Sequence, residues 1–85
     1  MTPKQREVQQ TNIIRTLIMN GWCVDRWGNY KKTSETGKDY RVKIQKVSMR
    51  LEAKVAGGWI NLVSDYFKNI EVANGHVVIK GRVVG

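Results

Sequence analysis

An N-terminal helix is the first element predicted by the pattern of apolar and polar residues. Thr2 is a plausible N-cap, Pro3 suits the first helical position, and Gln5 completes a capping box. Gly21 suits the position after the last helical residue. Only the second half carries apolar residues at helical spacing, namely Ile13, Ile14, Leu17 and Ile18. We expect that half to pack on the core, and residues 3–12 to be solvated or to contact a partner.

Alternation of apolar and polar residues predicts β-strands in the rest of the chain. Two short strands between Trp22 and Thr33 flank Gly28 and Asn29, which supply the positive φ of a tight turn. The polar residues 34–39 then predict an exposed loop.

The longest alternation runs from Tyr40 to Ala56, and its parity changes between Ile44 and Val47. An uninterrupted strand would therefore expose half of its apolar side chains. A β-bulge at residues 45–46 would restore one core face and bend the strand. The opposite face would then be mostly basic, with Arg41, Lys43, Lys46, Ser48, Arg50, Glu52 and Lys54.

Residues 59–70 have two interpretations. Gly57 and Gly58 fit a two-residue hairpin turn that pairs Ala56 with Trp59. Trp59 and Val63 would then lie on the basic face, and Ile60 and Leu62 would join the core. Helical spacing also fits the apolar residues Trp59, Val63, Tyr66, Phe67 and Ile70. We favour the strand because the glycine pair and its register explain more residues together, and a helical turn at 64–69 is compatible with both interpretations.

Asn74 and Gly75 lie between two apolar runs and predict a final hairpin in which Val72 pairs with Val77 and Ile70 with Ile79. Gly81 predicts a bulge or bend in the last strand. The fold class is therefore α+β, mainly β, with one N-terminal helix packed on a curled antiparallel sheet of about five strands. Such a sheet can curl into a small, partly open barrel. At 85 residues, we expect a single small basic domain spanning residues 1–85.

Composition excludes several classes of function. Cys23 is the only cysteine, so no disulfide can form within the chain; we expect it to be buried and the protein to be cytoplasmic. No apolar run is long enough to cross a membrane, and the N-terminus lacks the apolar region of a signal peptide. His76 is the only histidine, and no carboxylate pair or phosphate-binding loop is recognisable. We therefore expect no enzymatic activity, no metal site and no cofactor.

The positive charge is concentrated in one part of the chain. The net charge is +8, of which +6 lies between Arg26 and Lys54. Localised lysine and arginine with aromatic residues nearby is typical of proteins that bind single-stranded nucleic acid with low sequence specificity. Trp27 and Tyr30 are further candidates for base stacking. We predict an accessory protein that binds single-stranded DNA or RNA through Lys31, Lys32, Arg41, Lys43, Lys46, Arg50, Lys54 and Trp59.

Other interpretations of the same features remain open. Lysines and arginines are ordinary on solvated strand faces, where they also block aggregation. The chain could instead be an inhibitor or adaptor that docks on an acidic or nucleic-acid-handling protein through its polar helix half or a strand edge. A structural homodimer through an unpaired edge strand is a third hypothesis.

Overall fold

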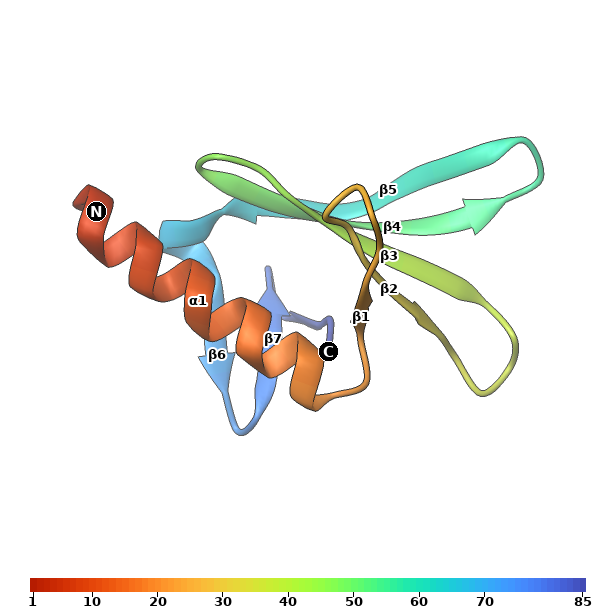
Figure 1. The fold of residues 1–85 in the computed structure, drawn as a ribbon, viewed down its shortest axis with the longest axis horizontal. Coiled ribbons are helices and arrows are strands. Elements are labelled where there is room, and N and C mark those ends of the chain that lie inside the picture. The colour runs from red at the N-terminus through yellow and green to blue at the C-terminus, as the bar shows by residue number, and fades with distance from the viewer.

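All 85 residues are described by the computed structural model, in which one helix precedes two antiparallel sheets (Figure 1). Helix α1 spans Pro3–Met19. Its capping box is confirmed, since the Thr2 hydroxyl accepts a hydrogen bond from the Gln5 N–H and the Gln5 side chain accepts one from the Thr2 N–H. The predicted stop is also confirmed: Gly21 has φ +93°, and the next N–H, of Trp22, donates to the carbonyl of Leu17.

The buried face of α1 is narrower than the apolar spacing predicts. Ile13, Thr16 and Leu17 are buried, but Ile18 is 55% exposed, so its predicted place in the core is wrong. The helix rests on the second sheet and the short turn before it, and Ile18 lies outside this contact. The polar first half is not wholly solvated, because the Gln9 amide donates a hydrogen bond to the carbonyl of Ile70.

The first sheet is a five-stranded antiparallel meander that extends away from the helix (Figure 1). Its strands are β1 (Cys23–Val24), β2 (Tyr30–Thr33), β3 (Asp39–Ile44), β4 (Ser48–Val55) and β5 (Gly58–Tyr66). The sheet is not closed, with β1 and β5 at its two edges. Cys23 is exposed in the short edge strand β1, so its predicted burial is wrong.

A 3-10 turn, η1 (Phe67–Asn69), leads into the second sheet. This sheet has three strands, β6 (Glu71–Ala73), β7 (His76–Ile79) and β8 (Arg82–Val83). The hairpin at Asn74 and Gly75 is confirmed, with Val72 opposite Val77. The bulge or bend predicted at Gly81 is instead a second tight turn, because Lys80 (φ +50°) and Gly81 (φ +78°) reverse the chain between β7 and β8.

The bulge predicted at Gln45 and Lys46 is wrong. The chain reverses there, and the Gln45 N–H closes the turn by donating to the carbonyl of Ser48 at 2.8 Å. The turn explains the parity change in the sequence. Residues before and after it belong to two different strands, so the apolar positions of one strand need not continue the alternation of the other. Arg41 now lies opposite Glu52 and Lys43 opposite Arg50, so these residues still share one face.

The strand interpretation of residues 59–66 is confirmed, but its register is shifted by one residue. The turn is Ala56–Gly57, which places Val55 opposite Gly58 and Lys54 opposite Trp59. A bulge leaves Leu62 without a partner between the pairs Glu52–Asn61 and Leu51–Val63. Val63 consequently packs against the core instead of joining the basic face, and Ile60 is 47% exposed because β5 is an edge strand.

The core lies between the inner face of the five-stranded sheet, the second sheet and α1. Its ten buried apolar side chains are Ile13, Leu17, Trp22, Val42, Met49, Leu51, Phe67, Ile70, Val77 and Ile79. The core covers only this one face of the five-stranded sheet, and no other element of the chain packs on the opposite face. The single helix is too short and too polar to cross a membrane.

Candidate nucleic-acid interface

The face of the five-stranded sheet that points away from the core, called the outer face here, is lined with basic residues. Strand pairing places Lys31 beside Arg41, Arg41 beside Glu52, and Glu52 beside Asn61, in one row across β2 to β5. The neighbouring pairs Lys43–Arg50 and Lys54–Trp59 extend this row to either side, and Ser64 lies opposite Arg50. The outer face therefore consists of Lys31, Arg41, Lys43, Arg50, Glu52, Lys54, Trp59, Asn61 and Ser64.

Trp59 lies across this face. Its strand, β5, is two strands away from Arg41, yet the Arg41 guanidinium carbon is only 4.3 Å from the centre of the Trp59 ring. The Lys31 ammonium, on the next strand, is 5.9 Å from the same ring centre. The indole must therefore fold back over β4, where the two cations hold it by cation–π attraction.

Trp27 supplies a second indole at the β1–β2 turn. The Arg26 guanidinium carbon lies 4.4 Å from its ring centre and the Lys31 ammonium 5.8 Å from it. The side chain is 67% exposed. Lys31 is thus shared by both indoles, which makes one continuous surface of two aromatic rings and three cations.

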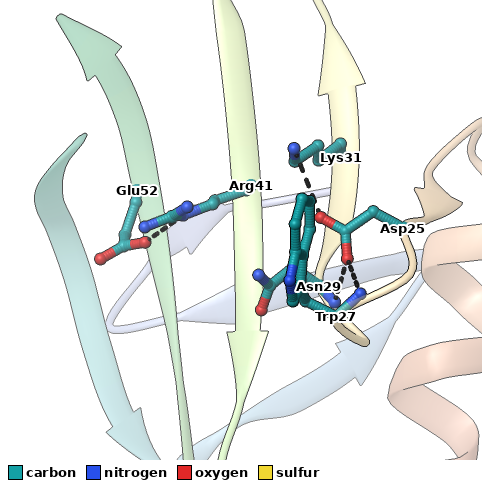
Figure 2. Close-up of polar contacts among 6 residues, drawn as sticks. All are labelled: Asp25, Trp27, Asn29, Lys31, Arg41 and Glu52. Atoms are coloured by element: carbon teal, nitrogen blue, oxygen red, sulfur yellow. Dashed lines mark hydrogen bonds and ion pairs between the residues drawn. The ribbon is translucent and has the colours of Figure 1, made fainter. Parts of the chain in front are cut away.

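Asp25 fixes the turn that carries Trp27 (Figure 2). One carboxylate oxygen accepts hydrogen bonds from the backbone N–H groups of Trp27 (2.9 Å) and Asn29 (3.0 Å), and the other lies 3.3 Å from the Lys31 ammonium. Burial acts to raise the pKa of Asp25, but the two N–H donors and Lys31 outweigh it and hold the pKa below its ordinary value. Asp25 therefore positions both the exposed indole and the shared lysine.

We predict that Asp25→Ala loosens this turn, whereas Asp25→Asn, which keeps one acceptor oxygen, preserves most of it. At neutral pH the alanine variant should melt about 4–8 °C below the wild type, the size of effect that loss of a cap has in a small domain. Because the folded pKa is lowered, the carboxylate stabilises the fold above the unfolded pKa of about 3.9 and loses this effect as the pH falls through the folded value. The difference in melting temperature between the wild type and Asp25→Ala should therefore be smaller at about pH 2 than at neutral pH, because the protonated side chain keeps only one neutral acceptor oxygen, as asparagine does. An equal difference at both pH values would contradict the role of the charge.

Glu52 is the second acidic group of the surface, and only 6% of the residue is exposed. Its two oxygens lie 2.5 Å from Nε of Arg41 and 3.2 Å from Nε of Arg50 (Figure 2 shows the Arg41 contact). One carboxylate thus holds two guanidinium groups in place on neighbouring positions. Each guanidinium keeps its terminal nitrogens for other partners.

The structure brings together most of the residues that the sequence predicts for this site. Lys31, Arg41, Lys43, Arg50, Lys54 and Trp59 share the outer face, and Lys46 is exposed in the adjacent β3–β4 turn. Lys32 lies on the other side of the sheet, where it pairs with Tyr40 and its ammonium donates to the carbonyl of Asn20 at 2.6 Å, so the structure does not bring it together with the other predicted residues. Tyr30 packs against the core and offers no stacking surface there. Successive strand residues point to opposite faces, which explains both placements.

Three contributors were missed. Arg26 stacks on Trp27, Asp25 orders the turn, and Cys23 lies opposite Lys31 at the edge of the same face. The segment Asp25–Asn29 contained a usable signal, because an aspartate shortly before Gly-Asn is typical of an Asx turn. The position of Cys23 depended on the pairing of β1 with β2, which alternation alone does not give.

No group of three or more histidine, cysteine or carboxylate side chains is arranged so that it could hold a metal ion. The two carboxylates at this surface, Asp25 and Glu52, are already paired with its cations. No protein-family model matches this chain, and neither the curated proteins nor the solved structures include a match to it.

Proposed function

We propose that the protein binds single-stranded nucleic acid on the outer face, with low sequence specificity and without catalysis. The observation that carries this proposal is the pair of indoles that share Lys31, flanked by Arg26 and Arg41. Unpaired bases stack on aromatic rings and guanidinium planes, at about 1–3 kcal/mol per base for aromatic rings, while lysines and arginines attract the phosphates. The surface offers both contacts side by side.

The form of the surface favours a single strand over a duplex. The surface is the open face of a sheet with an indole lying across it. The indole can stack only on a base whose ring face is not already covered by neighbouring bases, as it is in a duplex. The only helix, α1, packs on the second sheet, and no second helix accompanies it as in helix-turn-helix proteins. Stacking and phosphate contacts read little sequence, so the binding should be general.

Salt dependence tests the proposal directly. A fluorescently labelled single-stranded oligonucleotide of about twelve nucleotides should bind at 50 mM salt and lose about 50-fold in affinity at 200 mM, if four phosphates are contacted with a slope of about −0.7 each. A duplex of the same sequence should bind more weakly, because its bases cannot stack on the indoles. Fluorescence anisotropy measures both, and the absence of single-strand binding at 50 mM salt would overturn the proposal.

Two controls locate the binding surface. Trp27→Ala should weaken binding about tenfold, whereas Trp27→Phe, which keeps an aromatic ring, should weaken it less.

Cys23 is the only cysteine, is exposed and lies opposite Lys31, so its alkylation by a maleimide reports on this edge of the outer face. Bound oligonucleotide should slow the alkylation, and an unchanged rate at saturation would place the binding surface elsewhere.

A further inference from the structure

A polar cavity of about 310 Å³ opens where the outer face meets the end of β5. Seven of its eight lining residues are polar. Arg50, Asn61 and Ser64 come from the outer face, whereas Lys80 comes from the turn between β7 and β8 in the second sheet. The cavity therefore joins the two sheets at the far end of the surface from Trp27.

The cavity has several hydrogen-bond donors with no partner in the chain. Nε of Arg50 is buried and lies 3.2 Å from a Glu52 oxygen, whereas the terminal nitrogens of this 34% exposed side chain make no ion pair within the chain. The side chains of Lys80, Asn61 and Ser64 are likewise engaged by no hydrogen bond or ion pair. Two cations, an amide and a hydroxyl are thus left to donate to an incoming oxygen-rich group.

One carboxylate, Asp65, also lines the cavity. One of its oxygens accepts from the Tyr66 N–H at 2.8 Å and from the Asn69 amide at 3.0 Å. The Asn69 and Tyr66 hydrogen bonds, with smaller effects of Lys80 and Lys68, lower the pKa of Asp65 despite partial burial. Asp65 is therefore ionised at neutral pH, and Lys80 is close enough to lower its pKa. Arg50 and Lys80 are the two cations that line the cavity, and Asp65 is its only carboxylate.

We propose that this cavity binds a phosphate group of the nucleic acid, at the point where the strand leaves the outer face. This proposal rests on the proposed function and adds a path for the nucleic-acid strand. The strand crosses the sheet from the Trp27 indole to the Trp59 indole. It then follows Asn61 and Ser64 along β5 to the cavity between Arg50 and Lys80. Tetrahedral phosphate oxygens suit such a set of converging donors from guanidinium, ammonium, amide and hydroxyl groups.

Lys80→Gln tests the cavity, because it removes one cation and keeps a side chain of similar length. It should reduce affinity for a six-residue oligothymidylate about eightfold at 50 mM salt and flatten the salt slope by about 0.7, the value for one lost contact with a single strand. Ser64→Ala is a second variant that disturbs no backbone contact and should weaken binding about threefold. Lys4→Gln, on the exposed first turn of α1, is the matched control and should change neither quantity.

Amide NMR in a phosphate-free buffer separates this inference from the proposed function. With the oligothymidylate, and separately with inorganic phosphate, the Asn61, Ser64 and Lys80 amides should shift. Binding of the oligothymidylate with no change of affinity or slope in Lys80→Gln would overturn the inference and leave the proposed function standing. Shifts with inorganic phosphate but no oligothymidylate binding would keep a phosphate site and remove the function. If no amide of the protein shifts with either ligand, both the inference and the proposed function are overturned.

Discussion

Replacing Lys43 and Lys54 together by glutamate should abolish most binding of a single-stranded oligonucleotide, with a loss of at least 50-fold at 50 mM salt. Loss of two phosphate contacts accounts for about that factor, and the two new negative charges repel the strand further. Both lysines lie on the outer face, and neither is part of an ion pair. The contacts of Glu52 with Arg41 and Arg50 remain, so the fold should be retained. Anisotropy titrations and a melting curve measure the two outcomes.

The matched control is Lys4→Glu with Arg82→Glu, which changes the net charge by the same amount at exposed positions away from the outer face. If binding depends on the outer face, this control should lose far less affinity than the test variant. Equal losses in both variants would mean that binding follows the total charge of the protein. That result would contradict the proposed surface even if nucleic acid is bound.

The face assignment could be predicted from the sequence although the connection between the strands could not. Alternation depends on which side chains are buried, so Arg41, Lys43 and Arg50 were correctly placed on one face. A bulge and a hairpin both repair the parity change at residues 45–47, and alternation does not distinguish them. The hairpin is decided by long-range packing, because it lets Val42 and Leu51 pair with each other inside the core.

The local signals were dependable where one residue type is required by the backbone. Asn74 and Gly75 both need positive φ in their turn, and Gly21 needs it after the helix. At the β4–β5 turn, by contrast, Gly57 and Gly58 both tolerate such geometry, so the sequence could not fix the register to one residue. The sharing of Lys31 by two indoles was beyond prediction, because it requires Trp59 to fold across two neighbouring strands.

Glu52→Ala should lower the free energy of unfolding by about 2 kcal/mol, because hydrogen bonds to charged groups contribute about 1.5–3 kcal/mol and the two arginines that lose this partner stay partly solvated. Here the loss concerns two guanidinium groups, of Arg41 and Arg50, that share one carboxylate in a residue only 6% exposed. Small domains are stable by only about 5–15 kcal/mol in total, so this effect is large. Urea unfolding followed by tryptophan fluorescence measures it, and a loss below about 1 kcal/mol would show that the arginines do not depend on Glu52.

Glu52→Gln separates stability from binding, because the two should change in opposite directions. The amide can still accept a hydrogen bond from Arg41, so the variant should be less destabilised than the alanine variant, yet the outer face gains one net positive charge. Affinity for single-stranded oligonucleotide should therefore rise several-fold at 50 mM salt, and the gain should shrink at 200 mM. Glu35→Gln makes the same change of net charge in the exposed β2–β3 loop and should leave affinity nearly unchanged. A rise in affinity with a fall in stability, confined to Glu52, would mean that this carboxylate orders the arginines at the expense of the positive field that attracts the strand.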